Sequence, residues 1–226
     1  MYDIIFISYE EPNAEQNWQI LKDRFPHAKR VHGVKGIHNA HVKAAQKSFT
    51  KFFWVVDGDA EVKPDFDFSY TVPEHDSNTV HVWRSENPVN DLVYGYGGVK
   101  LLPTRLTKNM NTETFDMTTS ISQDFKVIEE VSNITAFNTD SFSAWRSGFR
   151  ECAKLASAQI DRQDDLETLE RLAIWCNVGT NSKYGLETIN GAKQGKKFGQ
   201  KNKENTQELA KINDIDWLRE MFNTGS

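Results

Sequence analysis

Two aspartates separated by one glycine have the type and the spacing to hold a metal ion. Asp57 and Asp59 directly follow the most apolar run of the chain, residues 52–56. Carboxylate oxygens in this arrangement suit Mg²⁺ or Mn²⁺ shared with substrate phosphates, and Gly58 would leave room for a diphosphate. Such a cation would stabilise the negative charge on a departing nucleoside diphosphate. A turn that is merely acidic is the alternative, and the apolar strand before it favours the metal site.

The elements that must position these aspartates are predicted to alternate between strands and helices. Short apolar runs indicate strands buried on both faces of a parallel sheet, and apolar residues at helical spacing indicate amphipathic helices. The predicted strands cover residues 3–9, 29–34 and 52–56, and the predicted helices begin at the N-cap Asn13 and after Gly36. Asp57 therefore stands where a buried strand leaves the sheet, which is where open α/β sheets bind ligands.

Beyond Pro64 the predicted elements change. Shorter strands at residues 79–83, 99–102, 125–129 and 134–137 indicate a mixed or antiparallel half. The C-terminal third is predicted to be helical, with helices that begin at Asp140, Asp165 and Asp214. Its glycines lower helical propensity but let helices or ligands approach closely; they are Gly185, Gly191, Gly195 and Gly199. We expect an α/β protein, with a mixed central sheet flanked by helices and a helical C-terminal cap, in one domain of residues 1–226.

The composition excludes several classes of protein. Hydrophobic residues make up 38% of the chain, too much for a disordered protein, and the net charge of −5 argues against a protein that coats nucleic acid with its whole surface. No apolar run is long enough for a membrane span and no leader segment is recognisable, so we expect a cytoplasmic protein. Cys152 and Cys176 lack the spacing of metal ligands and are predicted to be buried thiols.

Three segments of the chain resemble the nucleotide-sugar glycosyltransferases of the GT-A (Rossmann-like) fold, especially a large inverting family. They are Ser8-Tyr9-Glu10 at the end of the first strand, residues 33–41 at a helix start, and residues 53–62 around the two aspartates. The resemblance is looser after residue 100. It implies a nucleotide-binding half, an acceptor-side half and a helical C-terminal part, at residues 1–64, 65–140 and 141–226.

The resemblance also implies which residues bind the donor, a nucleoside diphosphate sugar and most readily a UDP-sugar, together with Mn²⁺ or Mg²⁺. The implied donor-binding residues are Ser8, Tyr9, Glu10, Asp57 and Gly58, with Lys35 near a phosphate and His38 facing the donor pocket. Ordinary loop polarity is the alternative for Tyr9 and Glu10, and simple solvation is the alternative for Lys35. A structural role is the alternative for His38 and for His41, which lack a third partner for a metal.

An inverting transfer needs a base that takes the proton of the acceptor hydroxyl. The resemblance implies Asp140 for this role, and Asp124, ahead of another predicted strand, is the reserve candidate. An aspartate before an apolar-periodic helix is equally typical of a structural N-cap, so both interpretations of Asp140 stay open. Arg146 could pair with Asp140 or with a phosphate.

A further resemblance, to glycosyltransferase-type proteins encoded by tailed bacteriophages, implies a particular acceptor. It rests on residues 35–38 and 139–146, and it implies 5-hydroxymethylcytosine in double-stranded phage DNA, modified in the host cytoplasm. The acceptor-side residues would be Gly97, Gly98, Arg146, Lys193, Lys196 and Lys197. The lysines belong to an acid-free run, residues 188–203, which could follow a phosphate backbone or could be a solvated helix face.

Several other functions stay open. A glycan or a protein could be the acceptor. A sugar nucleotidyltransferase would share the sheet but usually has a glycine-rich N-terminal loop with a basic residue, where this chain has Glu10-Glu11-Pro12. A noncatalytic DNA-binding or virion-assembly protein would show no sugar transfer and no response to metal. The oligomeric state is not predictable from these residues.

Overall fold

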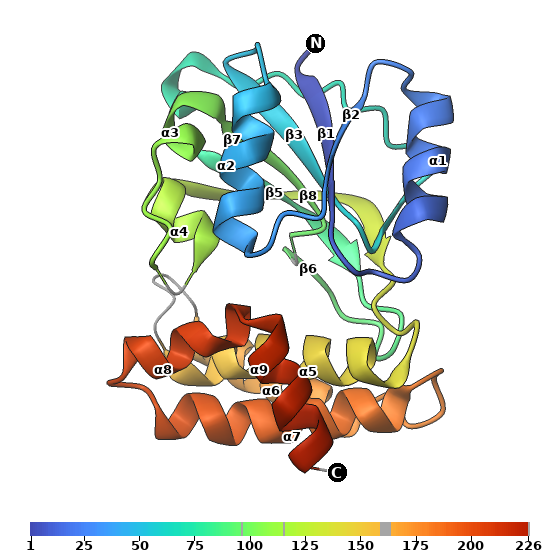
Figure 1. Ribbon diagram of the computed structural model, residues 1–226, viewed down its shortest axis with the longest axis vertical. Coiled ribbons are helices and arrows are strands. Elements are labelled where there is room, and N and C mark those ends of the chain that lie inside the picture. Colours follow the sequence, from blue (N-terminus) through green and yellow to red (C-terminus); the bar gives the residue numbers. More distant parts are fainter. Residues whose placement is uncertain (96, 115, 159–163, 226) are drawn as a thin grey trace. The chain divides into compact units, whose positions relative to one another are not determined.

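The computed structural model describes residues 1–95, 97–114, 116–158 and 164–225. The chain divides into two compact units (Figure 1). Unit 1 consists of Met1–Asn87 and Val93–Ala136, and it contains the sheet. Unit 2 consists of Pro88–Leu92 and Phe137–Ser226, and it is helical. That the whole chain acts as one catalytic domain stays a prediction.

A mixed sheet is the centre of unit 1. In the described residues it has eight strands: β1 (Asp3–Ser8), β2 (Lys29–His32), β3 (Phe52–Asp57), β4 (Ala60–Val62), β5 (Val80–Glu86), β6 (Val93–Tyr94), β7 (Val99–Pro103) and β8 (Phe125–Thr135). The order is β2-β1-β3-β7-β5-β8-β4, with β6 paired to β5. β1, β2 and β3 are parallel, whereas β7 runs antiparallel to both β3 and β5. The mixed α/β class is thus confirmed.

β3 lies in the middle of this sheet because its side chains are apolar on both faces. Residues 52–56 are each at most 5% exposed, and the strand pairs with β1 on one side and β7 on the other. The ring of Trp54 lies 4.5 Å from that of Trp83 and within 6 Å of the rings of Phe66 and Phe68, measured between centroids. The strand therefore ends at Asp57, its first polar residue.

Helices cover both faces of the sheet. α1 (Ala14–Arg24) packs on one face, and α2 (Ile37–Lys47), α3 (Thr104–Lys108) and α4 (Met117–Ile121) pack on the other (Figure 1). Alternation along β1 produces this arrangement, because Ile4 and Phe6 join the core on the α1 side while Ile5 joins the core on the α2 side. A short 3₁₀ helix, η1 (Glu74–Asp76), precedes β5.

One prediction about the strands was wrong. Residues 125–129 and 134–137 were expected to form two strands, but residues 125–135 are one strand, β8. A bulge beside Trp83 accommodates Glu129 and Glu130, so pairing with β5 resumes beyond them. The indole N–H of Trp83 donates to the Glu130 carboxylate over 3.0 Å, which gives one of these exposed acids a partner.

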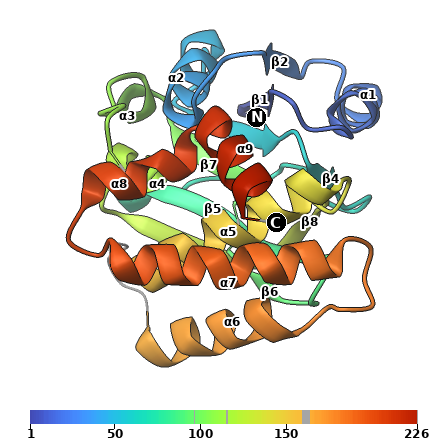
Figure 2. The same ribbon diagram turned by 60° about the horizontal axis from the view of Figure 1, so that its bottom comes forward.

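Unit 2 contains five α-helices in its described part: α5 (Ser141–Ser157), α6 (Asp165–Asn177), α7 (Gly185–Lys201), α8 (Thr206–Ala210) and α9 (Ile215–Thr224), with the 3₁₀ helix η2 (Lys211–Asn213) before α9. The helices predicted from Asp140, Asp165 and Asp214 are confirmed. Carboxylates of Asp140, Asp164 and Asp214 accept hydrogen bonds from backbone N–H groups at the starts of α5, α6 and α9. α7 lies beside α5 and α6 (Figure 2).

Glycines on α7 bring this helix unusually close to α5. Gly191, Gly195 and Gly199 recur at every fourth residue and therefore share one face of the helix. A methyl group on any of them would lie within 2.3 Å of a backbone carbonyl oxygen of α5. Gly148 of α5 approaches α7 in the same way. The prediction that glycines in this segment allow close approach is confirmed for a pair of helices.

Two further predictions concern the cysteines and the membrane. Cys152 and Cys176 are both buried and are not joined in a disulfide, as predicted. Across the described ranges, no helix is at once long and apolar enough to cross a bilayer.

Replacing Gly195 with alanine should destabilise unit 2. Helix propensity alone would make alanine better by about 1 kcal/mol, but the added Cβ would lie 2.1 Å from the carbonyl oxygen of Phe149. We expect a net loss of about 2 kcal/mol in the free energy of unfolding, typical of overpacking, measured by urea denaturation. Gln200→Ala, on the exposed face of α7, is the control and should be close to neutral. A Gly195→Ala protein as stable as the wild type would contradict this account of the helix pair.

Candidate active site

Parallel strands bring the predicted donor segment and the acidic turn to one edge of the sheet. In register, Ser8 at the end of β1 pairs with His32 at the end of β2, and Ile7 pairs with Asp57 at the end of β3. Because parallel strands end at a common edge, the loops that follow β1 and β3 lie there together. This carboxyl edge of unit 1 is the candidate site.

Asp57 is ion-paired with a lysine that was not among the predicted site residues. Nζ of Lys100, on β7, lies 2.7 Å from Oδ2 of Asp57 and also donates to the carbonyl oxygen of Gly97. The Lys100 side chain is only 4% exposed, whereas that of Asp57 is 33% exposed. A buried ammonium is tolerated only where acceptors surround it. Asp57 and the Gly97 carbonyl supply those acceptors, so Lys100 belongs to the site.

Gly97 and Gly98, predicted on the acceptor side, lie directly beside Asp57. The backbone N–H of Asp57 donates to the carbonyl oxygen of Gly98 over 2.9 Å. Gly97 has a φ of 88°, a conformation that favours glycine. A Cβ on Gly98 would lie 2.4 Å from the buried side-chain amide of Asn133. The two glycines therefore let β7 start close to both Asp57 and β8.

The turn that carries Asp59 is held by hydrogen bonds from two distant parts of unit 1. The side-chain amide of Asn17, on α1, donates to the carbonyl oxygen of Gly58 over 3.0 Å. The N–H of Ala136 donates to the carbonyl oxygen of Asp59 over 2.8 Å. Asn13 was expected to cap α1, but its side chain makes no capping hydrogen bond and donates to the carbonyl oxygen of Ala136 instead. The backbone of the acidic turn is therefore fixed, and both aspartates stay partly exposed.

Gly58 also has a reason within the protein to be glycine, whereas its expected role, to leave room for a diphosphate, stays a prediction. A Cβ on Gly58 would lie 2.6 Å from the Glu11 carboxylate and 3.1 Å from Cβ of Ser8. Glu11 is held at this place by the backbone N–H of Tyr9, which donates to its carboxylate over 2.7 Å. Glycine is needed because the loop after β1 passes over the acidic turn. Atoms of Glu11 and Ser8 lie in the space beside this glycine.

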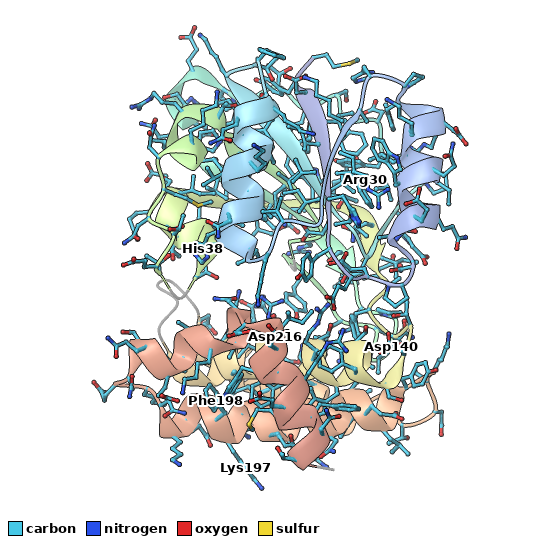
Figure 3. All side chains as sticks on the ribbon, viewed as in Figure 1. Arg30, His38, Asp140, Lys197, Phe198 and Asp216 are labelled. Carbon is cyan, nitrogen blue, oxygen red and sulfur yellow. The ribbon has the colours of Figure 1, made fainter. Side chains whose placement is uncertain are left out.

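The three residues at the end of β1 differ in accessibility. Ser8 is 2% exposed; its hydroxyl accepts a hydrogen bond from Nε of Arg30 and lies 3.0 Å from Nδ1 of His32. Arg30 extends from β2 on the side of the sheet where α1 packs (Figure 3). Tyr9 is half-buried and Glu10 is exposed. Ser8 thus ties the strand ends together, and Tyr9 and Glu10 are the members of this segment that a ligand can reach.

Both histidines of α2 have protein partners. Nε2 of His38 lies 3.1 Å from the hydroxyl of Thr114, and Nδ1 of His41 donates to the carbonyl oxygen of Ile37 over 2.8 Å. Burial, together with the charge of Lys100, lowers the pKa of His41 to about 3, so its ring is neutral near pH 7. These contacts favour the structural alternative for the two rings, and a donor-binding role of His38 (Figure 3) stays a prediction.

Lys35 and Asp124 lie at opposite edges of the sheet. Lys35 is exposed in the loop that follows β2, at the same edge as Asp57. Asp124 is exposed and immediately precedes β8, which is parallel to β5 and hence to β3. The start of β8 is therefore at the edge away from the end of β3. The topology does not bring Asp124, the reserve candidate for the base, together with the acidic turn.

In unit 2, Asp140 caps α5 (Figure 3). Its two carboxylate oxygens accept hydrogen bonds from the backbone N–H and the hydroxyl of Ser143, each over 2.8 Å. The N-cap interpretation is therefore confirmed, while the role of a base stays a prediction. Arg146 was expected to pair with Asp140 or a phosphate, but within the protein its guanidinium lies over the Phe142 ring, 5.8 Å from the centroid.

The predicted lysines lie on α7, but they do not share one environment. Lys193 and Lys197 are exposed and stand two residues after Gly191 and Gly195, which places them on the face of α7 opposite the glycines. Lys197 points away from the other helices of unit 2 (Figure 3). Lys196 is half-buried. Only the exposed pair is placed like residues that contact a phosphate backbone.

Lys196 instead faces the two cysteines. A hydrogen bond from Cys152, together with the charge of Lys196, lowers the pKa of Cys176 to about 7, while burial raises the pKa of Cys152. The contact between Cys152 and Cys176 was not predictable from the sequence pattern, because the two cysteines are far apart in the chain and lie on different helices.

The donor set at the carboxyl edge fits a metal ion that also binds a substrate. Among the described residues, no group of three or more His, Cys, Asp or Glu side chains is arranged to hold a metal. Mg²⁺, however, usually binds through one or two carboxylates and completes its coordination with phosphates and water. Asp57 and Asp59 meet this requirement. The ammonium of Lys100 opposes it, since it already occupies one oxygen of Asp57.

The fold and the site together define a mixed α/β protein with two carboxylates at the carboxyl edge of its sheet. No protein-family model matches the chain, and no curated protein matches it. Among solved structures, it is similar to a glycosyltransferase involved in the glycosylation of the major capsid of PBCV-1. The identity is 17%, the match covers 56% of this chain and 82% of that chain, and the TM-score is 0.35. A similarity this low carries no argument about activity, which must come from the residues themselves.

The buried ring of His41 should make unit 1 less stable in acid. In the folded protein His41 stays neutral down to a pKa of about 3, whereas in the unfolded chain it is protonated below about 6.5. The unfolded state binds more protons in this window, so the free energy of unfolding should fall by about 1.4 kcal/mol for each pH unit below 6.5. Urea denaturation at pH 7.5 and 5.5 measures this loss, and His41→Asn, which keeps a donor for the Ile37 carbonyl, should lose less. His27→Asn, at an exposed histidine, is the control and should match the wild type.

Proposed function

We propose that this protein is a metal-dependent glycosyltransferase that moves a hexose or a pentose from a nucleoside diphosphate sugar, most readily a UDP-sugar, to an acceptor hydroxyl. The observation that carries the proposal is the position of Asp57 and Asp59. They follow the central buried strand and stand at the edge where the ends of β1 and β2 and the start of β7 also lie. The GT-A-like segments in residues 1–100 support the same donor class.

In this proposal Asp57 and Asp59 hold Mn²⁺ or Mg²⁺ together with the phosphates of the donor. The cation would supply positive charge to the departing diphosphate. The chain's own contribution is a rigid backbone: hydrogen bonds from Asn17 and Ala136 fix the backbone of the turn, so this backbone need not be ordered when the donor binds. This preorganisation is what a shared phosphate and metal site requires.

The rest of the donor would lie along the ends of β1 and β2. Tyr9 and Glu10 are accessible there and would contact the nucleoside, and the exposed Lys35 would meet a phosphate. Ser8 and His38 are buried, so they would act by holding the strand ends and α2 in place. Gly97, which is partly exposed, would lie on the acceptor side of Asp57, while the buried Gly98 would act by keeping the start of β7 close to Asp57.

Asp140 would take the proton of the acceptor hydroxyl. Its carboxylate oxygens each accept one hydrogen bond from Ser143, and each oxygen keeps a lone pair for a proton. Capping and proton transfer are therefore compatible in one side chain.

For the acceptor we propose 5-hydroxymethylcytosine in double-stranded DNA. The support is the phage-like wording of residues 35–38 and 139–146 together with the exposed face of α7, where Lys193, Lys197 and Lys201 recur at every fourth residue. Contacts of this kind give affinity for a phosphate backbone without reading its sequence.

Nucleotide binding should depend on both the metal and the acidic turn. UDP with Mn²⁺ should raise the melting temperature of the wild type, because a ligand at 100 times its Kd stabilises the folded state by about 2.7 kcal/mol. Asp57→Asn and Asp59→Asn should abolish this shift. Asp65→Asn, at an exposed acid outside the turn, is the control and should keep it.

Other outcomes of the same experiment favour the other functions. A shift with nucleoside triphosphates and none with UDP would favour a sugar nucleotidyltransferase. No shift with any nucleotide, with or without Mn²⁺, would favour a noncatalytic protein.

Transfer itself should depend on Asp140. Asparagine caps helices as well as aspartate does, so Asp140→Asn should keep the fold and the UDP-dependent thermal shift. Loss of a general base typically lowers turnover by about a hundredfold or more. We expect such a loss in the transfer of labelled sugar from a UDP-sugar to hydroxymethylated DNA, with unmodified DNA as the acceptor control. Turnover near that of the wild type would exclude Asp140 as the base.

DNA binding that does not weaken with salt would argue against the lysines of α7 as contacts to the phosphate backbone.

A further inference from the structure

A positively charged group of the protein, the ammonium of Lys100, already lies beside the acidic turn. Nζ of Lys100 lies 2.7 Å from Oδ2 of Asp57, within the length of a charge-assisted hydrogen bond. The carboxylate that would hold a divalent ion is thus neutralised from inside the sheet. Any metal that binds Asp57 has to approach an ammonium group.

The side chain of Lys100 is almost fully buried and is held by acceptors of the protein. Its side chain is 4% exposed, it lies on β7 between the fully buried Val99 and Leu101, and its described acceptors are the Asp57 carboxylate and the carbonyl oxygen of Gly97. Lys100 therefore stays beside Asp57, next to the position of the metal.

A metal ion on the same carboxylate would stand close to this ammonium. A metal–oxygen bond of about 2.1 Å to Oδ2 itself would place the ion within about 5 Å of Nζ. At that separation, and in the low dielectric of a partly buried site, two positive charges repel each other strongly. The third N–H of Lys100 has no acceptor among the described residues, and an anion beside Asp57 could accept it.

We propose that Lys100 competes with the divalent cation for Asp57, so that the cation binds tightly only together with a diphosphate, to which Lys100 then transfers its hydrogen bond. This inference rests on the proposed function and adds to it how the binding of the metal depends on the binding of the diphosphate. The free protein binds metal weakly. Metal and nucleoside diphosphate bind cooperatively, because the diphosphate gives Lys100 a new partner and frees Asp57 for the ion.

Mn²⁺ alone is the probe that tests the competition, since it requires neither nucleotide nor turnover. Binding is measured by electron paramagnetic resonance or by titration calorimetry on the wild type, Lys100→Met, Lys100→Gln and Lys100→Arg. We expect the two neutral variants to bind Mn²⁺ at least about tenfold more tightly than the wild type, because the repulsion is removed. Lys100→Arg keeps the charge and should bind as weakly as the wild type.

Matched controls separate this effect from general changes in charge. Lys63→Met removes a lysine of unit 1 that is also ion-paired over 2.7 Å, with Glu86, and it should leave Mn²⁺ binding unchanged. Adding Asp57→Asn to Lys100→Met should remove the gained affinity. Unfolding curves for each variant show whether it is folded, and Lys100→Gln replaces Lys100→Met if the apolar side chain is not tolerated.

The inference is overturned if Lys100→Met or Lys100→Gln binds Mn²⁺ no more tightly than the wild type, or if none of the folded variants binds it. For the wild type, UDP should tighten Mn²⁺ binding at least about tenfold, and equal affinity with bound UDP would also overturn it. Failure of the proposed function is a separate result. In that case the neutral variants gain affinity for Mn²⁺, but UDP does not bind to any of them.

Discussion

The burial of β3 from both faces and both edges is the constraint on which the rest of the structure depends. Five consecutive apolar side chains can be buried only in the middle of a sheet that has helices on both sides. β1 and β7 then have to flank the strand, and the first polar residue after it has to leave at the carboxyl edge. Since β7 runs antiparallel to β3, the glycines at its start meet the acidic turn for the same reason.

Most of the fold was predictable because buried apolar residues recur along the sequence in a pattern that differs between strands and helices. Runs without polar residues gave the central strands, and apolar residues at helical spacing gave the long helices. The failures came where a tertiary contact overrides a local signal. Residues 130–133 were expected to separate two strands, but a bulge at Glu129 and Glu130 keeps the chain in β8. Asn13 has the right chemistry for a cap, but its side-chain NH₂ group donates to the carbonyl of Ala136, in a distant part of the chain, and its side chain makes no capping hydrogen bond.

The candidate site was less predictable, because periodicity tells which face a residue is on but not which group it meets. Asn17 is polar on an amphipathic helix, and its acceptor lies 41 residues away. Lys100 had a usable signal: a lysine inside an apolar strand is buried only when a carboxylate or a carbonyl compensates it. The contact of Gly58 with the loop that carries Glu11 was not predictable, because that loop crosses the glycine only in three dimensions.

The two sides of α7 differ in what they allow. The side that meets α5 accepts only hydrogen in place of a side chain at three successive turns, while two residues further on, at Lys193 and Lys197, the helix faces solvent. Substitutions on the solvent side change the electrostatic surface without altering the contact between the helices. A single helix thus combines a sterically invariant half with a half on which evolution can adjust charge at almost no cost in stability.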